Sequence, residues 1–156
     1  MLYYLELILK LFLSSLFAGF LGFEREKIGR SAGIRTFAMV SLGAVLYTIL
    51  SQKLFSDFLN TINNNTAVAS SLGFDPSRIL SQIIVGIGFL GAGVIIHQGQ
   101  KVTGLTTAAS LWVSAGIGAA IGMGFYLEAF VTACFAMIIL HGVRYLTKKD
   151  EMDGHH

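Results

Sequence analysis

Residues 105–146, LTTAASLWVSAGIGAAIGMGFYLEAFVTACFAMIILHGVRYL, decide how many times this chain crosses a membrane. The stretch holds enough apolar residues for two crossings, because one crossing of a bilayer needs about 20. Only Met123, Gly124 and Phe125 separate its two apolar halves. Either two spans meet here in a tight turn, or one long tilted helix runs through the whole stretch.

The distribution of lysine and arginine decides between these alternatives. If the stretch forms two spans, the chain has five, and eight cationic residues fall on one side: Arg25, Lys27, Arg30, Arg35, Lys101, Arg144, Lys148 and Lys149. The other side receives only Lys53 and Arg78, whereas merging the last two spans would leave five cations on each side. Lysine and arginine concentrate in cytoplasmic loops. The sequence therefore predicts five spans, with the N-terminus outside and the C-terminus in the cytoplasm.

The composition of the whole chain agrees with a membrane protein. Of the 156 residues, 54% are apolar and 13% are charged, whereas a soluble domain carries about 25% charged residues. We predict an all-α, polytopic bundle that forms a single transmembrane domain over residues 1–149. Its spans are expected at about residues 2–23, 34–54, 79–97, 105–123 and 126–146, followed by a disordered polar tail at 150–156.

Several classes of function are excluded by the residues present. A net charge of +2 is too small for a nucleic-acid-binding face. The single cysteine, Cys134, allows no disulfide framework and no thiolate metal site. No nucleophile, base and orienting group occur together, and no P-loop or zinc-protease motif is present, so we expect neither an enzyme nor an organic cofactor.

Small residues recur at helical spacing within the predicted spans. Close packing of such residues decides which helix faces meet in lipid. Those expected to pack helices are Gly86, Gly88, Gly91, Gly93, Gly118 and Gly122. The dense group at residues 86–93 indicates either very close helix contact or a locally broken helix, since each glycine lowers helix propensity by up to about 1 kcal/mol. The stripes also favour a homodimer.

Charged residues near membrane depth are candidates for function. Glu6 and Lys10 are four residues apart, which is typical of a structural ion pair. The alternating charges of residues 24–27 are typical of a solvated turn. Asp75 and Pro76 are suited to begin the third span as N-cap and first helical residue, and Glu128 has no oppositely charged sequence neighbour.

The connection at residues 51–78 is the longest polar segment of the chain. At its start, Phe55, Phe58, Leu59 and Ile62 recur at helical spacing, which predicts a short amphipathic helix on the membrane surface.

Several motifs occur in an order that resembles the membrane domain of the MgtC/SapB family. They are Gly22-Phe23-Glu24-Arg25, Ala32-Gly33-Ile34-Arg35-Thr36, Asp75-Pro76-Ser77-Arg78, Gln82, the glycine-rich run from Gly86 to Gly93, Gly104-Leu105-Thr106-Thr107-Ala108-Ala109 and Trp112. The resemblance covers essentially all five predicted spans.

The resemblance implies a multi-pass protein of the bacterial inner membrane that takes part in magnesium homeostasis and, in pathogens, in virulence. One hypothesis is a transporter of magnesium or another cation, with magnesium as its substrate or ligand. The alternative is a regulatory protein that transports nothing and binds another membrane complex, such as the ATP synthase.

The motifs also supply candidate residues for an ion pathway. We expect Asp75 with Arg78 to form an outer gate, and Glu24, Arg25 and Arg35 to form a cytoplasmic polar cluster. The remaining candidates are Thr36, Thr107 and Glu128. Asp75 and Glu24 are the candidate magnesium ligands, although five spans place them toward opposite faces, so they would not share one site.

Overall fold

A computed structural model describes the backbone of residues 1–64 and 77–153, and the side chains of residues 1–60 and 78–142. The described chain forms five helices and one two-stranded hairpin. The elements are α1 (Leu2–Lys27), α2 (Ile34–Asn64), α3 (Ser77–Val94), β1 (Ile96–Gln98), β2 (Lys101–Thr103), α4 (Leu105–Met123) and α5 (Tyr126–Asp153). The predicted all-α class is confirmed.

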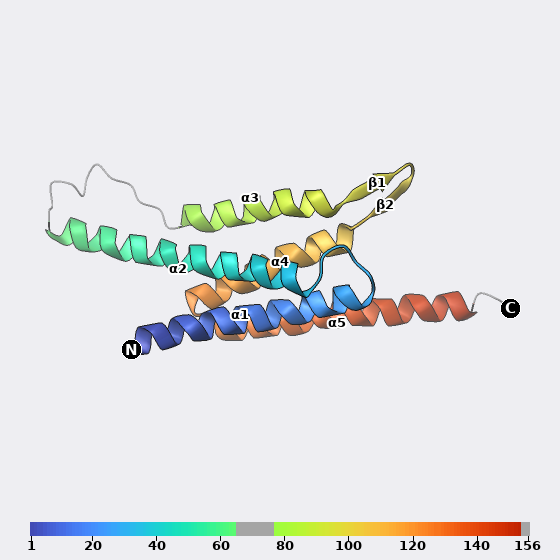
Figure 1. Ribbon diagram of the computed structural model, residues 1–156, viewed down its shortest axis with the longest axis horizontal. Helices are drawn as coiled ribbons and strands as arrows, with labels where there is room; N and C mark the ends of the chain where they lie inside the picture. Colours follow the sequence, from blue (N-terminus) through green and yellow to red (C-terminus); the bar gives the residue numbers. More distant parts are fainter. Residues whose placement is uncertain (65–76, 154–156) are drawn as a thin grey trace.

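The helices run back and forth along one long axis (Figure 1). Helices α1, α3 and α5 point one way, and α2 and α4 point the other way. The α1–α2 connection and the β1–β2 hairpin lie at one end, which we call the hairpin end. Met1 and the α4–α5 turn lie toward the opposite end, which we call the N-terminal end.

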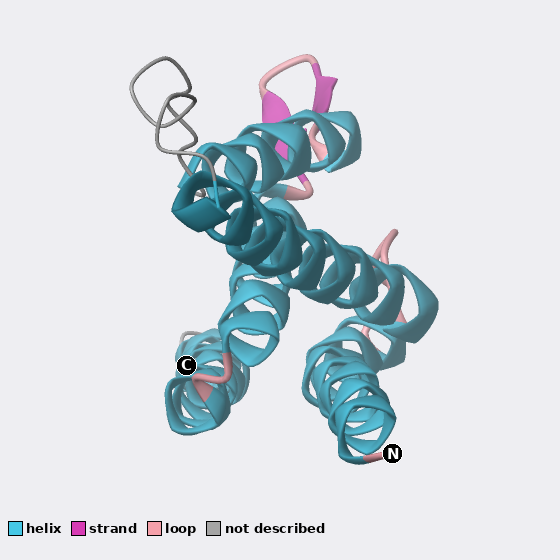
Figure 2. Ribbon diagram, turned by 90° about the vertical axis from the view of Figure 1, so that its left-hand side faces the viewer, coloured by secondary structure: helices cyan, strands magenta, loops and turns pink. Residues whose placement is uncertain are grey.

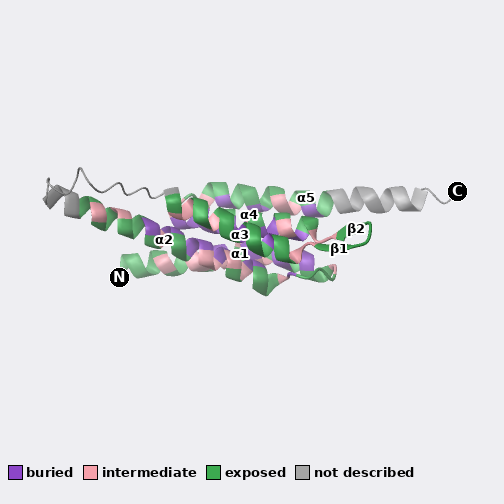
Figure 3. Cartoon of the chain, turned by 90° about the horizontal axis from the view of Figure 1, so that it is seen from above, coloured by how far each residue is buried: buried purple, intermediate pink, exposed green. Residues whose placement is uncertain are grey.

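Three of the five helices contain segments long and apolar enough to cross a membrane, namely Leu2–Lys27, Ile34–Asn60 and Leu105–Met123. The apolar segments of α3 and α5, Arg78–Val94 and Tyr126–Gly142, are shorter. Large apolar side chains cover much of the outside. Figure 3 colours the exposed residues green along the helices. Phe89 is 82% exposed and Leu127 is 71% exposed, so the outer surface suits lipid.

The contact between α2 and α4 places backbone directly against backbone. A side chain at Gly118 would collide with the carbonyl oxygen of Ser41 and lie 2.8 Å from its Oγ. One helical turn along, a side chain at Gly122 would lie 2.8 Å from Thr48 Cβ. Only glycine permits this approach, which brings Ser114 close enough to donate a 3.0 Å hydrogen bond to the carbonyl of Phe37.

Helices α1 and α2 meet closely at the hairpin end. A side chain at Gly22 would lie 2.7 Å from the Cα of Ile34. The side chain of Glu26 reaches across the connection, where its Oε2 accepts a 3.0 Å hydrogen bond from the backbone N–H of Ile34. This carboxylate satisfies one of the free N–H groups at the start of α2.

The charged run at residues 24–27 is therefore not a solvated turn, as its alternating signs had suggested. It forms the last turn of α1, in which Glu24 and Arg25 are buried and Glu26 and Lys27 are exposed. The tight packing at Gly22 removes one side of this turn from solvent.

Several helix boundaries also differ from those expected. Helix α2 continues without interruption into the segment expected to be a separate amphipathic helix, and α5 continues to Asp153, into the expected polar tail. Helix α3 is unbroken through its glycines but ends at Val94. His97, expected at the end of the third span, therefore lies in β1.

The hairpin beyond α3 depends on glycines. Gln98 pairs with Lys101 across a two-residue turn, and the first turn residue, Gly99, has a φ of 61°. Glycine at this position is typical of a type II′ hairpin turn. Gly104 then begins α4 with a φ of 90° while lying against the carbonyl of Val94.

The α2–α4 contact gives a direct test of the fold. We expect Gly118→Ala to destabilise the protein by about 1–3 kcal/mol, because the added methyl group overpacks the interface. Gly116→Ala is the matched control on the same helix, since a Cβ there meets nothing within 4 Å. Thermal unfolding in detergent would compare them. Equal stability of the two variants would contradict the described contact.

Candidate functional site

The most unusual polar group within the described part of the bundle is a buried pair of adjacent charges near the end of α1. Glu24 is 3% exposed and Arg25 is 4% exposed. Arg25 Nε lies 2.8 Å from Glu24 Oε2. Burying two charges is costly unless they compensate each other, so this pair is the first candidate for function.

The position of Glu24 within the helix makes its charge more costly. The carboxyl end of a helix carries partial negative charge, which favours Arg25 and disfavours Glu24. Neither carboxylate oxygen of Glu24 accepts a hydrogen bond from any residue that the structure describes. The contact with Arg25 is therefore the main described stabilisation of this carboxylate, and a further cation or hydrogen-bond donor would be favourable at Glu24.

The described residues contain no group of three or more His, Cys, Asp or Glu side chains able to hold a metal together. A protein-only cage for a metal is thus absent from this part of the chain. Magnesium does not require such a cage, because it commonly keeps several waters and binds through one or two carboxylates. Glu24 could contribute one such carboxylate to a hydrated ion.

The other candidate residues differ from this pair in burial and in the element that carries them. Arg35 and Thr36 are exposed at the start of α2, so the expected cluster of Glu24, Arg25 and Arg35 contains only its first two members as a buried unit. Thr107 is 1% exposed on α4. Glu128 is exposed in the first turn of α5.

The expected outer gate is described only in part. Arg78 is exposed near the start of α3. Asp75 and Pro76 lie outside the described residues, so the roles predicted for them stay predictions.

The glycines of α3 do not share one role. A side chain at Gly91 would make ordinary contact with Ala108 of α4, with its Cβ 3.6 Å from that of Ala108. Gly86, Gly88 and Gly93 have nothing within 4 Å of an added Cβ among the described residues. Close packing inside this chain therefore explains Gly118 and Gly122. Gly91 packs against α4 but has room for a Cβ, and no described residue explains the other three.

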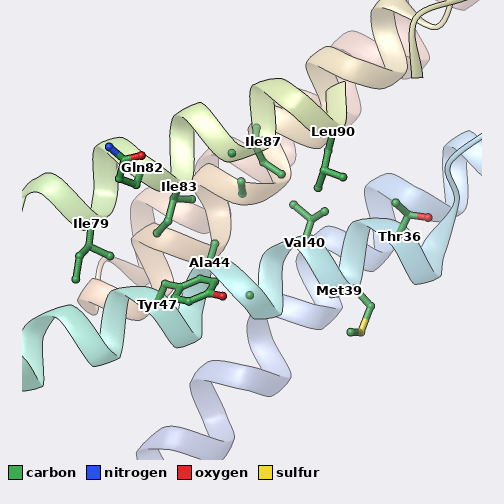
Figure 4. A pocket seen from close by; sticks show the side chains of 13 residues that line it. Thr36, Met39, Val40, Ala44, Tyr47, Ile79, Gln82, Ile83, Ile87 and Leu90 are labelled. Carbon is green, nitrogen blue, oxygen red and sulfur yellow. The ribbon is translucent and has the colours of Figure 1, made fainter. Parts of the chain in front are cut away.

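A groove of about 680 Å³ separates part of α3 from α2. Figure 4 shows Ile83, Ile87 and Leu90 of α3 facing Val40 and Ala44 of α2 across this space. Thr36, Tyr47 and Gln82 contribute its few polar groups, and none of the described residues that line it carries a charge. Its apolar walls are unsuited to a cation, so we do not assign an ion site there.

Buried hydroxyl groups in the α2–α4 contact were missed by the sequence reasoning. The hydroxyls of Ser41 and Thr48 are buried without a hydrogen-bond partner among the described residues. Ser41 and Thr48 are seven residues apart on α2 and lie opposite Gly118 and Gly122. This spacing places both hydroxyls on one helix face, so the sequence did contain a signal of the packed face.

The apolar exterior, the long apolar helices and the buried charged pair define a polytopic helical membrane protein. Comparison of sequences identifies its family: the profile of the MgtC family matches residues 11–149, and the chain belongs to this family.

Three relatives indicate the breadth of the family. The chain is 37% identical over 142 residues to "Putative magnesium transporter YhiD" of Escherichia coli K12, covering 91% of this chain and 62% of the relative. It is 34% identical over 145 residues to "Protein SapB" of Bacillus subtilis, covering 92% and 59%. It is 41% identical over 122 residues to "Protein MgtC" of Salmonella typhimurium LT2, covering 78% and 46%.

The chain thus spans about half to three-fifths of the length of these relatives. No solved structure matches it.

The buried pair can be tested by a double-mutant cycle. We expect Arg25→Met to destabilise the protein by about 3–5 kcal/mol, because it leaves the Glu24 carboxylate buried without its cation. The double variant Glu24→Gln/Arg25→Met should recover part of this loss. Thermal unfolding in detergent compares the native chain, the single variants Glu24→Gln and Arg25→Met, and the double variant. Additive effects of the two single substitutions would show that the pair is not coupled.

Proposed function

We propose that this protein acts in magnesium homeostasis in the bacterial inner membrane, and that it handles the cation at Glu24. The chain crosses the bilayer five times in this proposal, with its N-terminus outside. Membership of the MgtC family and the relative named for magnesium transport support the link to magnesium. The observation that carries the role of Glu24 is its buried carboxylate without a described hydrogen-bond donor.

The arrangement of charges supports the proposed orientation. The α1–α2 connection and the hairpin, which hold Arg30 and Lys101, lie at the same end of the bundle. Helix α5 also runs toward this end, and its sequence carries Arg144, Lys148 and Lys149 there. Cationic residues collect on the cytoplasmic side, so we assign the hairpin end to the cytoplasm. Glu24 then lies near the cytoplasmic surface.

The proposed path has an outer residue as well. Asp75, which precedes α3, is the proposed entry residue together with Arg78. Thr107 is buried on the same α4 helix that packs against α1 and α2, and it is a proposed secondary contact on the inner side.

Magnesium uptake into liposomes tests this function. We expect purified protein to admit magnesium along an imposed gradient, and Glu24→Gln to reduce the rate about tenfold or more, as the loss of one charged contact of about 1.4 kcal/mol would. Glu26→Gln is the matched control, because that carboxylate is exposed in the same last turn of α1, and a glutamine there can still accept the hydrogen bond from Ile34. A magnesium-sensitive dye inside the vesicles reports the rate.

Two results would contradict the proposal. Absence of uptake by well-folded protein would exclude transport by this chain, and normal uptake by Glu24→Gln would remove Glu24 from the path.

A second function is favoured by one face of α3 that no described residue covers. In this alternative the protein transports nothing and binds another membrane complex, such as the ATP synthase, or a second copy of itself. Gly88 leaves room for close approach of another helix, and Val85 and Phe89 project beside it with 66% and 82% exposure. Small residues beside a large exposed side chain suit contact between membrane helices.

The substitution Gly88→Leu tests this alternative. We expect it to reduce recovery of a membrane partner severalfold in pull-down from detergent extracts, because the added side chain prevents close approach of the partner helix. Gly116→Leu on α4 is the control, since that glycine is also exposed with open space around it. Chemical cross-linking of differently tagged copies separates a homodimer from a foreign partner. Unchanged recovery with Gly88→Leu would exclude this face.

A further inference from the structure

A second polar site lies at the other end of the bundle from Glu24. A cleft of about 460 Å³ opens between the first turns of α1 and the part of α2 that passes them. Figure 2, which looks onto the N-terminal end, shows these two helices diverging toward the viewer. Polar side chains from both helices line this cleft, which we call the α1–α2 cleft: Tyr3, Glu6, Lys10, Gln52, Lys53 and Ser56.

The α1 wall of the cleft carries an ion pair between Glu6 and Lys10, which lies one helical turn further into the apolar part of α1. Lys10 Nζ lies 2.9 Å from Glu6 Oε1. The Lys10 side chain is only 12% exposed, whereas that of Glu6 is 56% exposed. A shielded ammonium group on a membrane-spanning helix marks a functional site by default, because such groups are costly in lipid.

The α2 wall adds a second ammonium group. Lys53 lines the cleft and is exposed, and it forms no ion pair with any residue that the structure describes. Gln52 and Ser56 are its neighbours on the same wall and can donate hydrogen bonds. Two ammonium groups with amide and hydroxyl donors form a set that favours the oxygens of a phosphate.

The carboxylates of the cleft indicate which other charged group a phosphate-bearing ligand must carry. Glu6 and Asp57 line the same space. A ligand that carried only negative charge would be repelled by them, whereas one that also carries an amine would be attracted. The complementary ligand is therefore a zwitterion with a phosphate and an amine a few atoms apart.

The position of the cleft indicates that this zwitterion belongs to a lipid. Both walls belong to segments apolar enough to span a membrane. Leu7 and Ile49 supply apolar lining beside the charges, and Leu5 and Leu9 on α1 are 65% and 48% exposed toward the surroundings. An acyl chain could follow these side chains while its headgroup entered the cleft.

We propose that the α1–α2 cleft binds the headgroup of a zwitterionic phospholipid such as phosphatidylethanolamine. Lys10 and Lys53 hold the phosphate, and Glu6 and Asp57 attract the amine. This site is independent of the proposed role of Glu24, because no residue is shared and the two lie toward opposite ends of the bundle.

Native mass spectrometry of the delipidated full chain tests the proposal. Phosphatidylethanolamine and phosphatidylglycerol of equal chain length are titrated separately in detergent. We expect tighter binding of phosphatidylethanolamine, and a loss of about tenfold in its affinity with Lys53→Gln, equivalent to about 1.4 kcal/mol. Lys101→Gln is the matched control, since Lys101 is an exposed lysine in β2, at the hairpin end. It should leave the affinity unchanged.

A second variant tests the amine contact separately. Glu6→Gln should reduce the preference for phosphatidylethanolamine over phosphatidylglycerol, because it removes one of the charges that discriminate between them.

Three outcomes would overturn the proposal. These are equal affinity of the native chain for both lipids, equal losses with Lys53→Gln and Lys101→Gln, and displacement of the lipid by millimolar inorganic phosphate. The last result would assign the cleft to a soluble anion in place of a lipid.

Discussion

The rest of the bundle depends on the backbone contact between α2 and α4. Helix association in lipid gains little from the hydrophobic effect, so it relies on close packing and interhelical hydrogen bonds. Gly118 and Gly122 supply the close packing against Ser41 and Thr48, and Ser114 supplies the hydrogen bond to Phe37. Helix α4 in turn packs against α1, α3 and α5. An added side chain at Gly118 would therefore move the helix that organises all the others.

The buried charges at the end of α1 follow from the same packing. Gly22 lets the start of α2 approach α1, which encloses the last turn and removes Glu24 and Arg25 from water. Replacing a buried ion pair with apolar residues is often neutral or stabilising, so stability alone does not account for this pair. The proposed role of the Glu24 carboxylate in handling a cation would account for it.

The sequence was sufficient for the features that depend on composition and local pattern, because apolar length is a local property. It predicted α4 with the bounds observed, and the distribution of lysine and arginine correctly favoured two helices that meet at the turn around Gly124. It failed where tertiary contacts decide. Alternating charge at residues 24–27 has the same local signature in a solvated turn and in an enclosed helix end. The glycines of α3 likewise look alike in sequence, although among the described residues an added Cβ would contact a neighbouring helix within 4 Å only at Gly91.

The two polar sites are separated by a closed interior. Ser14, Ala18 and Leu21 of α1 and Phe37 of α2 are each 0% exposed, and Leu111 of α4 is 1% exposed. Movement of an ion between the ends would require helices to separate, and the α2–α4 contact is the costliest place to do so. Helix α3 lies beside the apolar groove that separates part of it from α2. A transport cycle in this fold would have space there to move α3 toward α2, whereas a regulatory protein could present the exposed face of α3 without moving it.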